Sequence, residues 1–439
     1  MERICLKSGI IQEGNSIKIL LIPEEDDNLI PSEKYRMMQR EFTVCLPTDI
    51  GNIHPDLIAL ATLLVAGPFV GNTLEPPLPV SSRFHLAVNS VLSKYKLSDK
   101  IDSNLTPRDA PSISMPMLAF SGGVDSTAAL SVMPKNTIPV FLDRPLKGKS
   151  LYNSQAAKKS VEYLSEIGYN TQSVSCDLEY IRHPVGFPTD MSVAVPALLL
   201  SDHMRATSIS FGTVMEAAFR IGHEKFNNYP TGSHYTFYST LFNAVGLYLS
   251  MPMAGVSEVG TSIIVEKSPI GFVAQSCIRG TMGNPCMKCW KCFRKDTLGR
   301  ALGIGPISPL GLRSLVSREV KSKLLAYPIG HENVVSYSLQ NYPREDLGPE
   351  DIALFEALLN RVRDNSKLDF LMRWYEPSKT LVEPSWREKF VVNMQEFLQP
   401  MTLEEISEIE SWSMGSFLAK PSTVSAHYRL EEILNDFNL

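Results

Sequence analysis

One short stretch of this sequence has the composition of an anion-binding loop. The residues Ser-Gly-Gly-Val-Asp-Ser, at positions 121–126, separate an apolar run from a helical pattern. Gly122 and Gly123 have no Cβ, so their amide groups can approach a phosphate closely. The helix that opens at Ser126 and Thr127 adds free N–H groups and the positive end of its dipole. We predict that this loop binds the phosphates of a nucleotide.

The side chains of the same loop suit phosphate chemistry. Ser121 and Ser126 supply hydroxyl donors, and Val124 precedes Asp125. A carboxylate would repel bare phosphate, so we expect Asp125 to hold Mg²⁺ beside the leaving pyrophosphate. Ser121, Asp125 and Ser126 are therefore the predicted catalytic residues. The Gly-Lys-Ser/Thr ending of a Walker loop is absent, which disfavours transfer of the γ-phosphate.

A second group of residues suits metal binding. Cysteines at positions 277, 286, 289 and 292 follow the spacing C-x8-C-x2-C-x2-C. Four thiolates at this spacing can close a tetrahedral zinc site, which leaves no open coordination position and so predicts a structural role. An iron–sulfur cluster uses the same ligands and stays open as an alternative. Basic residues surround the quartet: Arg279, Lys288, Lys291, Arg294, Lys295 and Arg300. Their simplest interpretation is as solvent-facing charges that balance the thiolates, with one or two of them as candidates for contacts with the ATP phosphates.

The whole chain reads as an ordinary globular protein. It has 439 residues, 20% charged residues and a formal net charge of −5, which disfavours generic nucleic-acid binding. The first residues show no secretory pattern, and the apolar stretch 57–70 is short for a bilayer span, so it predicts a buried helix. Seven cysteines without an export signal favour thiols or metal ligation over disulfides. We expect a cytoplasmic protein without membrane contact.

The middle of the chain must position both groups. Apolar strand patterns alternate with helical patterns, which is typical of an α/β fold with a parallel, Rossmann-like sheet whose ligands bind at the carboxyl edge. Glu216 and the two histidines His223 and His234 follow the fourth strand; Glu216 is a candidate to face substrate, and the histidines are equally typical of surface residues. The expected strands are 115–120, 137–143, 171–177 and 206–213, and the expected helices are 126–133, 150–167 and 191–204.

The patterns at the two ends of the chain differ from that of the middle, so we expect separate regions there. We divide the chain into a mixed α+β region at 1–112, a nucleotide-binding domain at 113–300, and a mainly helical region at 301–439. The polar, proline-containing stretch 97–114 is the expected linker. The first region contains predicted strands 17–22 and 42–46 and helices 55–66 and 84–95. The last contains predicted helices 351–363 and 385–398, with capping boxes at Ser385/Glu388 and Thr402/Glu405.

The loop and the cysteine quartet together resemble a known superfamily. Residues 121–126 resemble the PP-loop of the N-type ATP pyrophosphatases. The quartet followed by Arg294 is similar to the zinc site of the 7-cyano-7-deazaguanine synthase family. The dipeptides Val195-Pro196 and Tyr229-Pro230, and Gly212 at the end of a strand, also look similar, so the resemblance covers roughly residues 113–300.

The resemblance implies an ATP-dependent, carbon–nitrogen bond-forming ligase. Members cleave ATP to AMP and pyrophosphate and attach the adenylate to a substrate oxygen. In the synthase family a 7-deazaguanine acid is adenylated, ammonia forms an amide, and a second ATP drives dehydration to a nitrile. Asp143 and Arg144, after the second strand, lie where the family approaches the nucleotide. The implied cofactors are ATP, Mg²⁺ and Zn²⁺, and the implied partner is a small deazapurine-like acid.

The chain also departs from the family. Ala197-Leu198-Leu199 stands where the family typically has Ala-Arg-Asn, and Thr231-Gly232-Ser233 stands where it has Asp-Cys-Arg. Loss of these polar side chains predicts an altered acid or amine acceptor. Two alternatives stay open: a tRNA sulfur-transfer enzyme, disfavoured by the net charge, and a nucleotide-sensing module with a protein partner. The additions at both ends also leave room for a homodimer.

Overall fold

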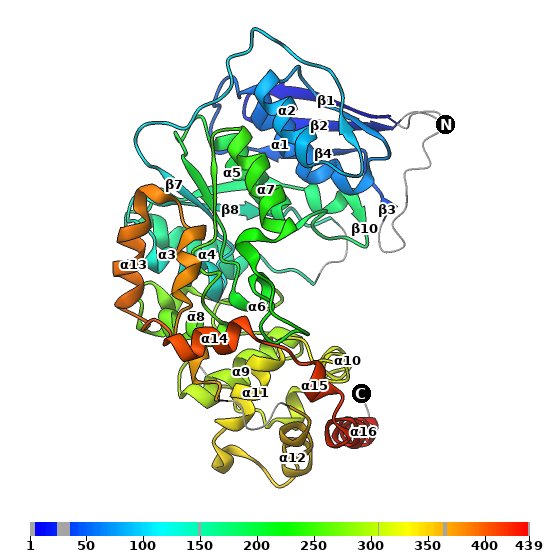
Figure 1. The fold of residues 1–439 in the computed structure, drawn as a ribbon, viewed down its shortest axis with the longest axis vertical. Coiled ribbons are helices and arrows are strands. Elements are labelled where there is room, and N and C mark those ends of the chain that lie inside the picture. The colour runs from blue at the N-terminus through cyan, green and yellow to red at the C-terminus, as the bar shows by residue number, and fades with distance from the viewer. Residues whose placement is uncertain (1–4, 24–35, 148–150, 306, 363–366, 438–439) are drawn as a thin grey trace.

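The computed structural model describes residues 5–23, 36–147, 151–305, 307–362 and 367–437 (Figure 1). Within these residues the protein is a mixed α/β structure with one large sheet, ordered β12-β11-β7-β8-β9-β4-β2-β1-β5-β6. No helix in the described residues is both long and apolar enough to cross a membrane.

The glycine-rich loop lies in the parallel half of this sheet. Five strands form that half, and they pair with one another in parallel. They are β7 (Pro116–Ala119), β8 (Ile138–Asp143), β9 (Gln172–Cys176), β11 (Ser208–Ser210) and β12 (Tyr248–Ser250). Numbered in chain order, their spatial order is 3-2-1-4-5, so the direction of winding reverses between β7 and β11. Crevices for ligands form at such a reversal, outside the carboxyl ends of the strands.

The other half of the sheet comes from the N-terminal region. Its strands are β1 (Cys5–Glu13), β2 (Ser16–Pro23), β4 (Glu41–Cys45), β5 (Thr73–Glu75) and β6 (Lys96–Leu97). Strand β4 pairs antiparallel with β9, through Val44 opposite Cys176, so the sheet continues across the division drawn at residue 112. A separate two-stranded sheet joins β3 (Arg36–Met37) to β10 (Arg182–His183).

Helices cover the sheet and continue the chain beyond it. Those up to the metal-binding segment are α1 (Pro55–Ala66), α2 (Ser82–Val91), α3 (Val124–Val132), α4 (Gln155–Glu166), α5 (Val195–Leu200), α6 (Met215–Ala218), α7 (Ser233–Ala244) and α8 (Glu258–Lys267). The later ones are α9 (Trp290–Leu302), α10 (Arg318–Leu324), α11 (Glu332–Gln340), α12 (Ile352–Arg361), α13 (Arg387–Gln395), α14 (Leu403–Glu410), α15 (Gly415–Leu418) and α16 (Pro421–Asn435).

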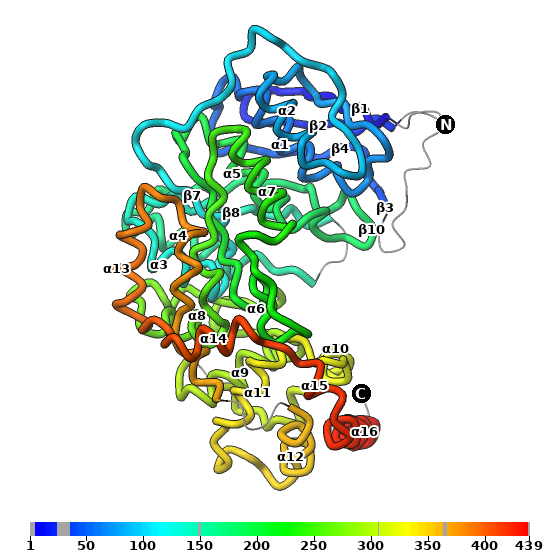
Figure 2. The backbone as a smooth tube through the Cα atoms, in the orientation of Figure 1, coloured from blue at the N-terminus to red at the C-terminus, as the bar shows by residue number. Residues whose placement is uncertain are grey.

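The C-terminal region occupies two places on the molecule. Helices α10, α11, α12 and α16 form the end of the molecule farthest from the N-terminal strands (Figure 1). The segment that carries α13 returns to the sheet and lies beside α3 before the chain runs back through α14 to α16 (Figure 2). Trp374 and Phe390 of this returning segment join the same hydrophobic cluster as Phe120 and Leu130.

Several expected elements are confirmed closely. The helix predicted at 55–66 has those bounds, and every residue from Asp56 to Ala66 is buried because α1 packs against α5. The four predicted strands of the parallel sheet are all present, although β11 covers only Ser208–Ser210. Thr402 forms the predicted capping box with Glu405. Ser150 and Arg363, at the ends of two predicted helices, lie outside the described residues.

Two expected elements are wrong in detail. The helix predicted at 191–204 is a 3₁₀ turn at Asp190–Ala194 followed by the short α5. The predicted capping box at Ser385 is absent: Ser385 lies within a turn at Pro384–Trp386, and α13 begins only at Arg387. The hydroxyl of Ser385 instead donates to the carboxylate of the buried Glu383, at 2.7 Å.

Candidate functional site

The glycine-rich loop forms the turn between β7 and α3. Gly122 has a φ of +73°, and a Cβ there would lie 3.1 Å from the Cα of Ala157, so the turn needs glycine. Ser121 and Ser126 hold it closed through their hydroxyl oxygens, which lie 3.1 Å apart. The amide of Thr127 donates back to Gly123. The seven predicted loop residues, 121–127, are therefore brought together at one strand-to-helix turn.

Several amides of this turn are free to bind a ligand. No described residue accepts a hydrogen bond from the amide of Gly122, Val124 or Asp125, whereas the amide of Gly123 donates to the hydroxyl of Ser121 at 3.4 Å. Such N–H groups at a helix start favour anions. Gly212, after β11, packs directly on this helix start, because a Cβ on it would lie 2.8 Å from the carbonyl carbon of Asp125. The loop thus lies at the reversal point between β7 and β11.

Asp143 and Arg144 lie at the carboxyl end of β8, the strand next to β7. Asp143 pairs with Lys158 of α4 at 2.8 Å. Arg144 pairs with Glu179 at 3.3 Å, and its guanidinium carbon lies 3.4 Å from the ring centre of Tyr152. Both side chains are partnered and only partly buried, on the sheet edge that carries the glycine loop.

A cluster of buried polar groups lies next to Asp125. The hydroxyl of Thr261, on α8, donates to Asp125 at 2.9 Å. One turn earlier on α8 is Glu258, which is buried and pairs with Arg294 of α9. Burial alone would raise the pKa of Glu258, but the positive charges of Arg294 and Lys295 lower it below its usual range. Glu258 is therefore an ionised carboxylate held by cations.

Glu216 is the second buried carboxyl group of this cluster. It accepts hydrogen bonds from the side chain of Asn333, at 2.9 Å, and from the amide of Glu258, at 3.3 Å. Burial, followed by the charge of Glu258, raises its pKa to about 8. Strongly shifted carboxyl groups concentrate at functional sites. Glu216 lies shortly after β11 at the carboxyl edge of the sheet, as the sequence indicated, but its side chain is fully buried rather than facing solvent.

The two histidines singled out in the sequence have different surroundings. His234 is half exposed and lies 3.5 Å from Asp190, whose pKa it lowers through a hydrogen bond. His223 belongs to the buried cluster, with its ring centre 6.0 Å from that of His331. The sequence interpretation missed Glu258, Thr261, His331 and Asn333. Ser257, which caps α8, could have indicated where that helix starts. No local sequence signal connects His331 and Asn333 to α8.

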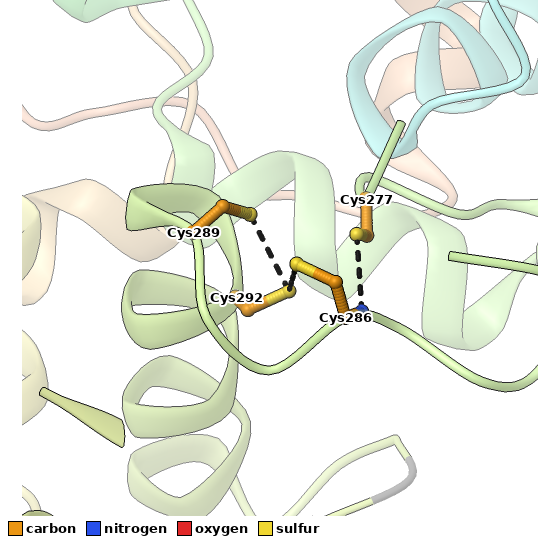
Figure 3. Close-up of side chains that lie close together, drawn as sticks. All are labelled: Cys277, Cys286, Cys289 and Cys292. Carbon is orange, nitrogen blue, oxygen red and sulfur yellow. Dashed lines mark hydrogen bonds between the residues drawn. The ribbon is translucent and has the colours of Figure 1, made fainter. Parts of the chain in front are cut away.

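The four predicted metal ligands meet at one point (Figure 3). All four sulfur atoms lie within 4.8 Å of one another, with 3.5 Å between Cys289 and Cys292 and 3.8 Å between Cys286 and Cys292. Zn–S bonds of about 2.3 Å in a tetrahedron require sulfur atoms about 3.8 Å apart. Met287, with a φ of +52°, makes the turn that brings the ligands together. The arrangement fits a single tetrahedral ion such as zinc.

The cysteine cluster is tied to the glycine loop and to the C-terminal region. The amide of Gln275, two residues before Cys277, donates to the carbonyl of Gly122 at 2.8 Å. On the other side, Glu319 of α10 pairs with Arg279 at 2.6 Å and accepts the amide of Trp290 at the start of α9. A metal held here would therefore stabilise one wall of the loop.

The positions that depart from the family differ in their surroundings. Ala197, Leu198 and Leu199 are buried in α5 and belong to the largest hydrophobic core cluster. Thr231 and Ser233 are exposed, and both lie where the 3₁₀ turn at Tyr229–Thr231 leads into α7. Apolar packing at α5 thus replaces the polar side chains that the resemblance implies.

Comparison with known proteins gives a match for part of the chain. Residues 238–413 are similar to a family of unknown function (DUF6395). The matched segment starts after the glycine loop and includes the four cysteines, Glu258 and His331. No curated protein and no solved structure matches the chain.

Proposed function

We propose that this protein is an ATP-dependent ligase that cleaves ATP to AMP and pyrophosphate. The adenylate would be attached to a carboxyl or amide oxygen of a small acid, which ammonia or another amine then attacks. The proposal rests on the resemblance of residues 121–126 to the PP-loop and on the surroundings of that loop. The protein would act mainly by positioning and electrostatics, since an acyl adenylate is already reactive.

One observation carries the proposal most directly. Amides of Gly122, Val124 and Asp125 that no described residue accepts lie at the point where the strand order reverses. This combination of free N–H groups, helix start and sheet crevice is how α/β folds bind nucleotide phosphates. The first N–H groups of any helix lack a partner within the helix, and here they adjoin a glycine turn at the carboxyl edge of the sheet.

The chain has residues for each cofactor. The amides of the loop, with the hydroxyls of Ser121 and Ser126, would hold the phosphates. Asp125, whose carboxylate is partly exposed and already accepts one hydrogen bond from Thr261, would hold Mg²⁺, which neutralises charge on the leaving pyrophosphate. The four cysteines would hold a structural zinc ion, because a closed thiolate site has no position for substrate.

The acid substrate is proposed to differ from that of the synthase family. Leu198 and Leu199 are fully buried in the core, so the polar recognition implied by the resemblance is absent there. A 7-deazaguanine-7-carboxylic acid is the first compound to test, followed by other heteroaromatic carboxylic acids and their amides.

The test is product analysis with purified protein, MgATP, ammonium chloride and a panel of acids. We expect AMP and pyrophosphate in equal amounts with at least one acid, and a fall of about 100-fold or more in Asp125→Asn. Formation of ADP, or no ATP turnover by metal-loaded protein with any acid, would defeat the proposal. ATP binding without turnover would favour a nucleotide-sensing module, and a brown protein would favour sulfur transfer.

A further inference from the structure

The C-terminal region, which the superfamily resemblance does not cover, contributes a histidine to the polar cluster beside the glycine loop. His331 immediately precedes α11 and has a left-handed backbone, with a φ of +59°. The next residue, Glu332, is fully buried, pairs with the equally buried Arg361 at 3.0 Å and accepts the amide of Ile329 at 2.8 Å. A strained conformation held from both sides is typical of functional positions.

The ring of His331 faces a carboxylate. Its Nδ1 lies 3.2 Å from Oε1 of Glu258. An ionised carboxylate at this distance favours the tautomer with the proton on Nδ1, which leaves Nε2 as the basic nitrogen. The pair is not aligned as a hydrogen bond, and catalytic pairs often tighten only around substrate.

His331 is more accessible than the carboxylate and the guanidinium group beside it. Its side chain is 28% exposed, whereas those of Glu258 and Arg294 are 5% and 6% exposed. Glu258 and Thr261 lie on the same face of α8, about 5 Å apart along the axis for one helical turn. Because Thr261 contacts Asp125, Glu258 and Thr261 connect the side chain of His331 to the carboxylate of the loop across one turn of α8.

The surroundings keep this ring neutral. Burial, followed by the charge of Arg294, lowers the pKa of His331 to about 4, although Glu258 opposes the shift. The other groups that face it are His223, after α6, and Lys295 of α9, and both lower the pKa further. At neutral pH the ring is therefore neutral, with Nε2 unprotonated.

We propose that His331 accepts the proton of the attacking amine. The inference rests on the proposed function and adds a catalytic residue from the C-terminal region. The amine nitrogen forms a bond to the acyl carbon of the adenylate, the bond from that carbon to the phosphate oxygen breaks, and AMP leaves with the bonding electron pair. The proton lost by nitrogen moves to Nε2 of His331 and then to water.

The test separates adenylation from amine attack. His331→Asn suits the site, because asparagine tolerates a left-handed backbone and carries an amide N–H₂ that can face Glu258, yet it has no nitrogen that can accept the proton. His427→Asn is the matched control in the same region, since His427 contacts Arg361 and Tyr327. The acid is 7-deazaguanine-7-carboxylic acid, or whichever acid of the panel supports exchange of pyrophosphate into ATP by the wild-type protein.

We expect His331→Asn to keep pyrophosphate exchange within about two-fold and to lose about 100-fold or more of the ammonium-dependent rate. His427→Asn should keep both rates. Equal loss of exchange and amide formation, or loss of neither, would overturn the assignment of His331. Absence of exchange in the wild-type protein would overturn the proposed function and this inference with it.

Discussion

At the scale of single residues, the proposed nucleotide site depends on the glycines of the loop. Gly122 combines a φ of +73° with a close contact to Ala157. We expect Gly122→Ala to cost about 1–2 kcal/mol of backbone strain, to push the loop away from α4, and to weaken ATP binding. Thermal unfolding and calorimetric titration with MgATP measure the two effects.

A second glycine supplies the control for that experiment. Gly168 also has a positive φ, of +95°, but a Cβ there would meet nothing within 4 Å. Gly168→Ala should therefore show comparable strain with unchanged ATP affinity. If Gly122→Ala binds ATP as the wild-type protein does, the loop is not the phosphate site.

Glu216 predicts a specific dependence of stability on pH. Its pKa rises from 4.5 to about 8 on folding, so the native state binds more protons than the unfolded state between these values. The free energy of unfolding contributed by this group is therefore full below pH 4.5 and is lost as pH rises toward 8, with a slope of up to about 1.4 kcal/mol per pH unit. Glu216→Gln should remove this slope.

Denaturant unfolding of both proteins at several pH values between 5 and 9 measures the difference. Glu162→Gln, which changes an exposed carboxylate on α4, is the control and should keep the wild-type slope. Identical slopes in the wild-type protein and Glu216→Gln would show that Glu216 is ionised in the native state, and its interpretation as a neutral group would be wrong.

At the scale of elements, a local sequence pattern predicted the structure correctly where contacts within the same helical turn determine it. The capping box at Thr402 and Glu405 formed because each side chain meets an amide within its own turn. The similar pattern at Ser385 failed because Glu383, held by the indole of Trp386 and the hydroxyl of Thr207, attracts the serine hydroxyl instead. A distant residue, Thr207, thus helps fix the carboxylate that competes with the predicted cap.

The cysteine cluster is the element that the spacing of its residues predicted best. We expect one zinc ion per chain by elemental analysis, and its loss in Cys289→Ser together with a markedly lower melting temperature, since metal binding and local folding are coupled. ATP affinity should also fall, because Gln275 links this segment to Gly122. Cys45→Ser, which changes an exposed cysteine outside the cluster, should retain the metal. A metal-free wild-type protein with the same melting temperature would contradict the structural role.

At the scale of the whole molecule, the sequence predicted the parallel strands and the loop but not how the ends of the chain join them. Nothing in the residues 41–45 indicates that β4 pairs with β9, because pairing of distant strands is decided by tertiary packing. Likewise His331 and Asn333 lie in a helical pattern without a catalytic motif, and only the fold brings them to Glu258 and Glu216. The sequence therefore predicted the site residues that are neighbours along the chain, and missed those that only the fold brings together.

This mixing of distant segments predicts that the chain unfolds as one unit. Trp374, fully buried, packs edge-to-face on Phe390 at 6.0 Å in the cluster that also contains Phe120. Trp374→Ala should cost about 3–5 kcal/mol and lower the melting temperature of the whole protein in a single calorimetric transition. Met372→Ala, two residues earlier and 36% exposed, should cost far less. A chain that ends at residue 300 lacks Trp374 and Phe390 and should not fold. If that chain instead folds with the wild-type melting temperature and binds ATP, the C-terminal region is a separate unit, because the core beneath the loop would then be complete without it.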